Sequence, residues 1–171
     1  MTLLSILQYP DPRLKRISIP VEVAKIKEPL IQQAINDMFE THYASENCAA
    51  LAATQLDLEP AWRITVIDFS EKKNEPLCLI NPEIIKAEGE QFENEGCMSV
   101  YPEILHEKVI RAERIKVKFF DREGKERELE AEGFMAKCIQ HEVDHLDGKI
   151  YLDRLSNLKR QRLLDRFKKR K

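Results

Sequence analysis

The sequence holds 171 residues, of which 43% are hydrophobic and 34% are charged, and its formal net charge is −2. This length and composition favour a single globular domain over 1–171, and neither repeats nor low-complexity linkers divide the chain. No apolar run approaches the roughly 20 residues of a membrane span, and the N-terminal residues lack the features of a signal peptide, so we expect a cytoplasmic protein.

Three elements are expected in the first half of the chain. A helix is predicted over 28–45, where apolar residues recur at helical spacing and Pro29 falls in the first turn. Two strands should follow. Residues 62–70 are rich in β-branched and aromatic side chains, and residues 77–85 form a second apolar run.

The second half begins with a predicted hairpin. Residues 114–121 alternate between polar and apolar, and residues 126–133 follow after a turn-like REGK segment. A helix is expected between Gly133 and Gly148 and a last helix over about 153–169, because apolar residues recur at helical intervals in both. Short strands interrupted by three helices, without regular βαβ alternation, predict an α+β fold.

The predicted helix before Gly148 contains an H-E-x-x-H motif made of His141, Glu142 and His145. Residues at positions i and i+4 share one face of a helix, so both imidazoles can reach one divalent cation. Catalytic metal sites generally use three protein ligands and one water molecule. The motif therefore predicts a metal site and requires a third ligand elsewhere in the chain.

The familiar zinc peptidases with this motif take their third ligand downstream. One form needs a histidine six positions after His145, where this chain has Tyr151, and residues 146–171 contain no Glu or His for another form. The third ligand is therefore expected upstream. Cys97 is favoured because Gly96 beside it allows a close backbone approach and a thiolate suits a borderline-soft metal. The other upstream candidates are His42, His106, Cys48, Cys78, Cys138 and the carboxylates.

Three separated stretches resemble motifs of the peptide deformylase family. QHEVDHLDG (140–148) is similar to its H-E-x-x-H motif, EGCMSV (95–100) to its E-G-C-[LM]-S motif, and CAALAATQ (48–55), imperfectly, to G-x-G-L-A-A-x-Q. YPDPRLKRIS (9–18) resembles the usual family opening. The resemblance implies an enzyme that removes the formyl group from the N-terminal formyl-methionine of newly made proteins. We expect short antiparallel strands around a central metal-binding helix, with a basic C-terminal helix.

By this resemblance the metal ligands are Cys97, His141 and His145, with water in the fourth position. The family usually holds Fe²⁺ in the cell and also accepts Zn²⁺, Ni²⁺ or Co²⁺. Because the general affinity order places iron below zinc and nickel, purified protein can contain a different ion. Arg111 matches a family arginine, and we expect it to pair with Glu95 behind the metal; the alternative is a plain surface arginine.

The resemblance also implies catalytic roles for three further groups. Glu142 is expected to act first as general base and then as general acid. The side-chain amide of Gln55 and the backbone N–H of Met98 are expected to stabilise the oxyanion that forms on the substrate. These roles make an N-formyl-methionyl peptide of nascent chains the expected substrate.

The resemblance places the peptide in an extended conformation beside the first motif, as an added strand. Backbone groups of Ala49, Ala50 and Gly96 are its expected hydrogen-bond partners. Cys138, on the same helix face as the first histidine of the metal motif, should line the methionine pocket together with Phe134. Plain core packing is the alternative interpretation of Cys138.

Two segments depart from the family pattern. Cys48 and Ala50 replace two usual glycines of the first motif, where glycine allows unusual backbone angles and close substrate approach, so this departure bears on peptide affinity. The segment 101–111 is longer than the common form. It places Leu105 or His106 where many relatives carry an arginine near the peptide.

The C-terminal segment is strongly basic. Residues 156–171 contain eight basic residues and one acidic residue, a net charge of +7, whereas the rest, with 20 basic and 29 acidic residues, carries −9. A basic tail on an acidic body indicates a polyanionic partner, and a solvated helix end is the plain alternative. Family members with a basic C-terminal helix dock it on the ribosome, and Arg160, Arg162, Lys168 and Arg170 fit that purpose.

Two other functions are compatible with the sequence. A non-catalytic relative would keep the metal site and bind ribosomes or nascent chains through its tail. A metallopeptidase would cleave internal peptide bonds of unformylated substrates, although the missing downstream ligand disfavours it. Hydrolysis of a formyl-methionyl peptide by the metal-loaded protein distinguishes deformylase activity from both.

Overall fold

The computed structural model describes residues 2–168, which contain three α-helices and four short 3-10 helices. The α-helices are α1 (Pro29–Ala44), α2 (Gly133–Leu146) and α3 (Asn157–Lys168). The 3-10 helices are η1 (Pro12–Lys15), η2 (Val23–Lys25), η3 (Ala53–Gln55) and η4 (Tyr151–Arg154).

Seven strands of the described chain form two antiparallel sheets. The strands are β1 (Ala50–Ala52), β2 (Ile64–Ile67), β3 (Leu77–Glu88), β4 (Gln91–Glu95), β5 (Glu107–Arg111), β6 (Arg114–Phe120) and β7 (Glu126–Glu132). One sheet has the order β1-β2-β3-β6-β7, and β4 pairs with β5 in the other. Bulges interrupt the pairing of the long strand β3 with β6, and bulges bend a strand, so β3 can lead from one sheet toward the other.

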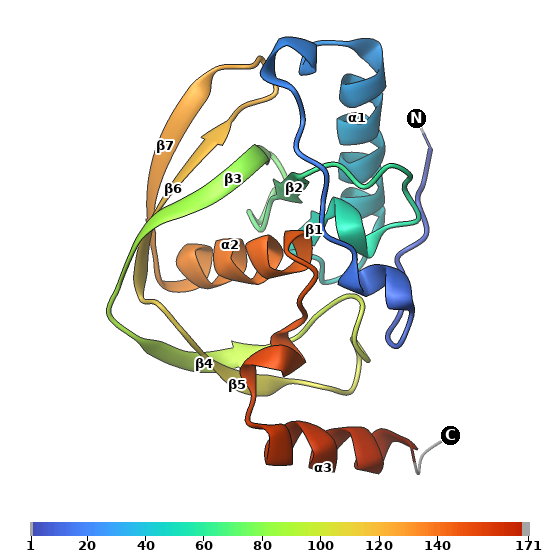
Figure 1. The fold of residues 1–171 in the computed structure, drawn as a ribbon, viewed down its shortest axis with the longest axis vertical. Helices are drawn as coiled ribbons and strands as arrows, with labels where there is room; N and C mark the ends of the chain where they lie inside the picture. Colours follow the sequence, from blue (N-terminus) through green and yellow to red (C-terminus); the bar gives the residue numbers. More distant parts are fainter. Residues whose placement is uncertain (1, 169–171) are drawn as a thin grey trace.

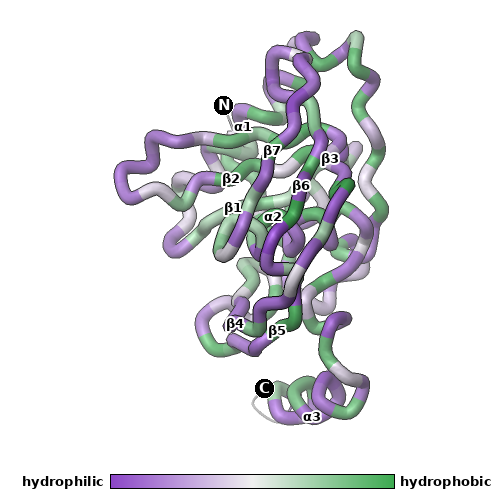
Figure 2. Tube along the Cα trace, turned by 90° about the vertical axis from the view of Figure 1, so that its left-hand side faces the viewer, coloured by the Kyte–Doolittle hydropathy of each residue, from purple (hydrophilic) through white to green (hydrophobic). Residues whose placement is uncertain are grey.

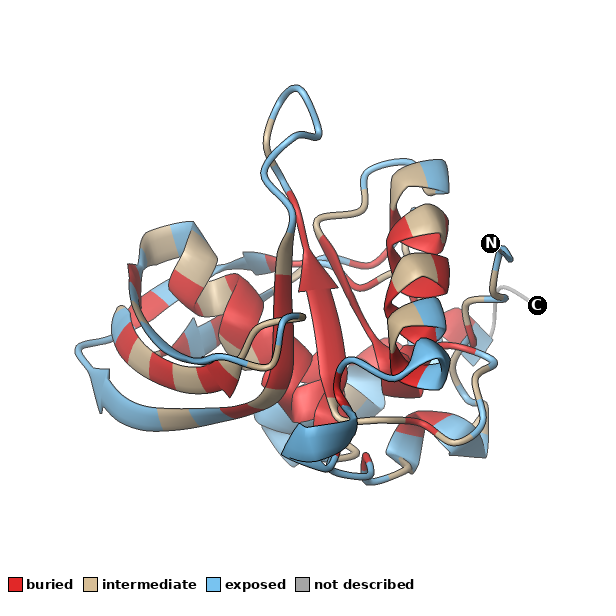
Figure 3. Ribbon diagram, turned by 90° about the horizontal axis from the view of Figure 1, so that it is seen from above, coloured by how far each residue is buried: buried red, intermediate tan, exposed pale blue. Residues whose placement is uncertain are grey.

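Helix α2 lies between the two sheets, and α1 packs beside β1 and β2 (Figure 1). Side chains of a strand point alternately to opposite faces, so β2 can pack against α1 with one face and against α2 with the other. Ile64 and Val66 belong to the apolar cluster that includes α1, whereas Ile67 belongs to the cluster that includes Ile139 of α2. Figure 3 shows the central strands buried, with helices on both sides of them. This burial fixes the position of α2, and with it the H-E-x-x-H motif.

A third apolar cluster lies around the loop that follows β4. It contains Cys97 and Val100, and two residues of α3, Leu163 and Phe167, are buried in it. Figure 2 shows α3 at the lower end of the molecule, with hydrophobic and hydrophilic residues interleaved along the helix. Helix α3 therefore contacts the body through a narrow apolar stripe and exposes the rest of its surface.

The expected α+β fold is confirmed, as are the first two helices and the hairpin of β6 and β7. The last helix begins later than the predicted 153, at Asn157, because residues 151–154 form the separate helix η4 and Ser156 caps the start of α3. Its predicted end at 169 and the basic Arg170 lie outside the described residues. The strands β1, β4 and β5 were not among the predicted elements.

No helix within residues 2–168 combines the length and the apolar composition that crossing a membrane requires.

Gly148 provides a test of how the end of α2 is anchored to the N-terminal segment. It adopts φ +79°, and a Cβ there would lie 2.6 Å from the backbone oxygen of Lys15. Gly133, at the start of α2, adopts φ +58°, and a Cβ there would meet no atom within 4 Å. We expect Gly148→Ala to lower the free energy of unfolding by about 2–4 kcal/mol and the control Gly133→Ala by about 1 kcal/mol, measured by urea unfolding. Equal losses would contradict the expected steric clash with Lys15.

Candidate metal centre

Helix α2 places both imidazoles of the H-E-x-x-H motif at one buried point. The Nε2 atoms of His141 and His145 lie 3.2 Å apart. The sulfur of Cys97 lies 3.3 Å from Nε2 of His145. One ligand atom from each of these three buried residues lies within 4.8 Å of the other two. The structure therefore brings together the three residues that the sequence predicted as ligands.

Cys97 reaches the helix because the chain turns sharply after β4. The N–H of Val100 donates to the carbonyl of Cys97 at 3.1 Å, which closes the turn. The N–H of Ser99 points back to the Cys97 sulfur at 3.4 Å. A Cβ at Gly96 would lie 2.6 Å from Nδ1 of His106, so any larger residue there would displace the exposed His106 ring. The turn thus holds the sulfur in place from two sides.

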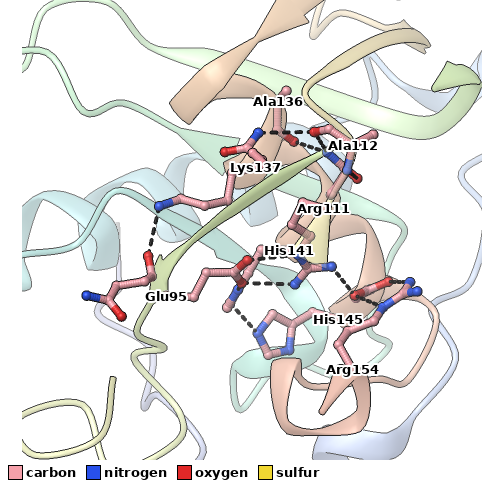
Figure 4. Close-up of polar contacts among 12 residues, drawn as sticks. Glu95, Arg111, Ala112, Ala136, Lys137, His141, His145 and Arg154 are labelled. Atoms are coloured by element: carbon pink, nitrogen blue, oxygen red, sulfur yellow. Dashed lines mark hydrogen bonds and ion pairs between the residues drawn. The ribbon is translucent and has the colours of Figure 1, made fainter. Parts of the chain in front are cut away.

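A buried network of charged groups lies behind His141 (Figure 4). Nδ1 of His141 lies 2.8 Å from Oε1 of Glu95. The Arg111 guanidinium donates to both carboxylate oxygens of Glu95, at 2.8 and 2.9 Å, which confirms the predicted pairing. Arg111 also binds Asp144 at 2.6 Å, and Asp144 in turn binds Arg154. A hydrogen bond from Nδ1 to Glu95 leaves Nε2 of His141 as the free acceptor that a metal requires.

This network controls the ionisation of Glu95. Burial alone disfavours its carboxylate, but the hydrogen bonds from Arg111 and His141 outweigh that effect and lower the pKa of Glu95 to about 2. Glu95 is therefore ionised at neutral pH and can hold the ring of His141 in a fixed orientation. Metal-ligating histidines generally depend on such a partner for their tautomer and orientation.

Glu142 is the acidic residue closest in sequence to the donor cluster. It is buried, and its Oε2 has no hydrogen-bond partner among the described residues. Burial raises the pKa of Glu142 to about 7. A carboxyl group that titrates near neutral pH can both accept and return a proton.

The donor set fits a divalent cation. Ligands held about 2.0–2.3 Å from one tetrahedral ion lie roughly 3.3–3.6 Å from each other, close to the 3.2 and 3.3 Å that separate Nε2 of His145 from the other two donor atoms. His145 supports this interpretation, because burial and the neighbouring His141 lower its pKa well below the usual range and keep its imidazole neutral. One thiol and two imidazoles leave a fourth position for water or substrate.

Gln55 and Met98 lie at the same centre. Oε1 of Gln55 accepts from the N–H of Ala52 at 2.9 Å, so its amide nitrogen faces Ser99 at 3.1 Å and the Cys97 sulfur at 3.7 Å. The carbonyl of Met98 accepts from the Gln8 side chain at 2.9 Å, while its N–H makes no hydrogen bond within residues 2–168. The NH₂ group of Gln55 thus faces the cluster, and the N–H of Met98 follows directly after Cys97 in the chain.

The residues predicted to bind the peptide lie along two strand edges. The carbonyl of Ala49 already accepts from Asp68, so alternation in the antiparallel pair turns the backbone of Ala50 toward the open edge of β1. Gly96 follows directly after β4, whose other edge is unpaired in the described chain. Cys138 is buried in the cluster that includes Ala50, with Ala49 packed against it.

Phe134 and the residues that depart from the family pattern can now be placed. Phe134 is half exposed and makes an edge contact with Phe69, with ring centroids 4.7 Å apart. The Cys48 sulfur lies 3.2 Å from Nδ1 of His42, which directs the side chain toward α1. Of the two loop residues, Leu105 is buried in the apolar cluster, and His106 is the one beside Gly96.

An α+β fold with a buried Cys/His/His donor set and a buried carboxyl group beside it defines a metal-dependent hydrolase. The family model for polypeptide deformylase matches residues 3–161. A peptide deformylase 1 from Coxiella burnetii is 62% identical over 164 residues, 96% of this chain and 94% of that protein. A peptide deformylase from Chromobacterium violaceum is 50% identical over 99% of this chain and 97% of its own.

Comparison with solved structures points to the same family. A peptide deformylase from Legionella pneumophila superimposes with a TM-score of 0.84 at 43% identity, covering 98% of this chain and 96% of that one. A peptide deformylase from Ehrlichia chaffeensis in complex with actinonin superimposes with a TM-score of 0.86 at 35% identity, covering 100% of this chain and 99% of that one. The chain belongs to the peptide deformylase family. Nothing in these similarities favours a non-catalytic binder or a metallopeptidase.

Sequence reasoning missed two members of the charged network, Asp144 and Arg154. Asp144 lies three residues after His141 on α2, but the sequence carries no sign of its role or of its partner. Arg154 lies in η4 and reaches Asp144 across the end of α2. Only the packing of η4 against the helix reveals this contact.

The network predicts a large stability loss when Arg111 is removed. In Arg111→Met, Glu95 loses both guanidinium bonds and Asp144 loses one, although both carboxylates stay buried. We expect the free energy of unfolding to fall by about 3–5 kcal/mol in urea titrations at neutral pH. The matched control is Arg114→Met, whose exposed ion pair should contribute less than about 1 kcal/mol. Similar effects of the two substitutions would contradict the assigned importance of the buried network.

The lowered pKa of Glu95 also predicts a pH dependence. A carboxyl with a folded pKa of about 2, against an ordinary 4.5, stabilises the fold fully above 4.5 and loses this contribution as the pH falls through 2. Arg111→Met lacks the guanidinium that lowers this pKa. The difference in free energy of unfolding between wild type and Arg111→Met should therefore shrink as the pH falls from about 5 to about 2. A constant difference across that range would contradict the assignment.

Proposed function

We propose that this deformylase acts with one divalent cation held by Cys97, His141 and His145. The convergence of these three donors, with the buried carboxyl of Glu142 in the next position of α2, is the observation that carries the proposal. The reaction is hydrolysis of the formamide bond of an N-formyl-methionyl peptide. The newly synthesised chains that carry this group are made in the cytoplasm, where we place the enzyme.

Fe²⁺ is the cation we propose for the cell, with Zn²⁺, Ni²⁺ or Co²⁺ as substitutes. The donor set of one thiol and two imidazoles suits all of these borderline-soft ions. When bound, the cation supplies Lewis acidity, because it lowers the pKa of water and polarises a carbonyl oxygen. Binding also requires a deprotonated thiol and neutral imidazoles, so it should release protons.

Glu142 moves the proton in this proposal. Its buried carboxylate accepts the proton of the attacking water and returns it to the amine that leaves. The pKa of about 7 suits this dual role at neutral pH. Burial also excludes solvent water that would compete for the carboxylate.

Gln55 and Met98 supply the hydrogen bonds that stabilise the developing oxyanion. The bond from Ala52 fixes the Gln55 amide so that its NH₂ group, rather than its oxygen, faces the site. The N–H of Met98 is free of bonds to residues 2–168, and the Gln8 side chain holds the opposite end of that residue. Removal of one such donor typically costs about 3 kcal/mol in transition-state stabilisation.

The substrate would add a strand between two open edges. Main-chain groups of Ala50 on β1 and of Gly96 after β4 offer hydrogen bonds from opposite sides, and alternate side chains of the peptide would enter pockets. Cys138 and Phe134 would line the pocket for methionine, and Ala49 would support the strand from the sheet side. The small side chains of β1 leave room for this close approach.

Two substitutions separate metal binding from catalysis. Cys97→Ala should lose bound metal, because two imidazoles remain as the ligands. Glu142→Ala should keep the metal while kcat for a formyl-methionyl peptide falls about 10²- to 10⁴-fold. Metal content per chain and kcat are measured on protein prepared without oxygen and loaded with Fe²⁺. Cys78→Ala, which removes a buried thiol from β3, is the control. Metal retained by Cys97→Ala would show that the proposed ligand set is wrong.

The ribosome is the partner we propose for α3. Arg162 and Lys168 are exposed on it, whereas Arg160 already faces Asp153 at 3.3 Å. Arg170 lies outside the described residues. Basic side chains that contact phosphates release counterions, so such binding weakens as salt rises.

The proposed docking is tested by charge removal rather than by deletion, because α3 is partly buried. Arg162→Gln/Lys168→Gln should weaken co-sedimentation with ribosomes and reduce its dependence on salt concentration. The control Lys72→Gln/Lys125→Gln removes two exposed charges elsewhere and should change neither property. Equal co-sedimentation of both variants and wild type would refute docking through α3.

A further inference from the structure

Tyr101 adopts an unusual backbone conformation next to the metal centre. Its φ is +44°, in the left-handed region that bulky side chains avoid. Such a conformation is strained and persists only where surrounding contacts hold it. The residue is the first after the turn of Cys97–Val100, so its conformation sets how the chain leaves that turn.

Contacts with a distant helix hold Tyr101 in place. Its ring stacks on Phe167 of α3, with centroids 4.7 Å apart and planes at 13°, and the ring of Tyr9 lies 6.2 Å away from it. Its carbonyl accepts from the N–H groups of Ile104 and Leu105. The ring and the carbonyl are thus both fixed. Among these contacts, the stack on Phe167 is the one that reaches α3.

The same stack lies against the apolar cluster that backs the metal ligand. Phe167 and Leu163 of α3 are buried in a cluster with Cys97 and Val100, and Tyr101 packs against it. Helix α3 therefore packs against the loop that carries Cys97, and it also presents a basic surface. Its two faces serve different purposes, since the buried stripe contacts the loop and the basic residues remain exposed.

We infer that Tyr101 is a positioning residue for deformylation and that α3 holds it through Phe167. Tyr101 acts through the turn before it, which carries the Cys97 sulfur and the N–H of Met98. If Tyr101 relaxed toward negative φ, the turn would shift and the Met98 N–H would leave the position of the oxyanion. The inference rests on the proposed role of that N–H. A displacement of about 1 Å in a catalytic group can cost about 100-fold in rate.

The inference is tested with a double-mutant cycle on the full-length, Fe²⁺-loaded protein. Tyr101→Ala and Phe167→Ala should each lower kcat, by about 10- to 100-fold for Tyr101→Ala, with KM changed less than about threefold and metal content unchanged. The double variant should lose little more than Tyr101→Ala alone, because both changes remove one contact. Tyr101→Phe keeps the ring and should restore kcat to near the wild-type value. Leu158→Ala, an exposed apolar residue of α3, is the control and should leave kcat unchanged.

A second readout does not depend on activity. Hydrogen exchange should accelerate in peptides over 97–105 of Tyr101→Ala and Phe167→Ala, and it should stay unchanged over 133–146. If Tyr101→Ala does not fold, Tyr101→Gly tolerates the positive φ and lacks only the ring, and it should show the same loss of kcat. Unchanged kcat in the folded variants, or additive effects in the double variant, would overturn the inference. An inactive wild type would instead contradict the proposed function.

Discussion

The hydrogen bond between Glu95 and His141, 2.8 Å long, joins the strand that leads to Cys97 with the helix that carries both histidines. Its strength comes from burial, which makes an unpaired charge costly and a paired one strong. Arg111 forms ion pairs with both Glu95 and Asp144, so the loss of any one of these groups would leave a buried charge without its partner. The imidazole of His141 stays oriented because the groups behind it, Glu95 and Arg111, are already paired.

This constraint explains the arrangement of the two sheets around α2. A helix with charged groups on one side and an apolar stripe on the other needs two different neighbours. The five-stranded sheet covers the apolar side, and β4 and β5 bring Glu95 and Arg111 to the charged side. Because β4 belongs to a separate sheet, its outer edge stays open beside the metal centre, as does that of β1. The same separation leaves these two edges unpaired within the described residues, and the proposed peptide would lie between them.

The departures from the family pattern lie around the proposed peptide site and not among the metal donors. The Cys48 sulfur lies 3.2 Å from Nδ1 of His42 and 3.5 Å from the carbonyl oxygen of Ala50, so it contacts both α1 and the open edge of β1. On the side of β4, the His106 ring lies against Gly96 and narrows the space through which a peptide would approach that residue. Tyr101, the first residue of the segment 101–111, finds its partner in α3. The donor set is therefore kept, and the departures lie around it.

Local patterns in the sequence determined α1, α2 and the hairpin of β6 and β7, because helical and strand periodicities are properties of neighbouring residues. The motifs likewise identified the donor set, and the match of Arg111 identified its partner Glu95. The strands β1, β4 and β5 are short, and each is stabilised by pairing with the neighbouring strand of the chain across an intervening loop. The contact of Asp144 with Arg154 and the stack of Tyr101 on Phe167 depend on which elements pack against each other. These contacts were decided by the tertiary structure alone, because nothing in the local sequence specifies which distant surface will be buried against another.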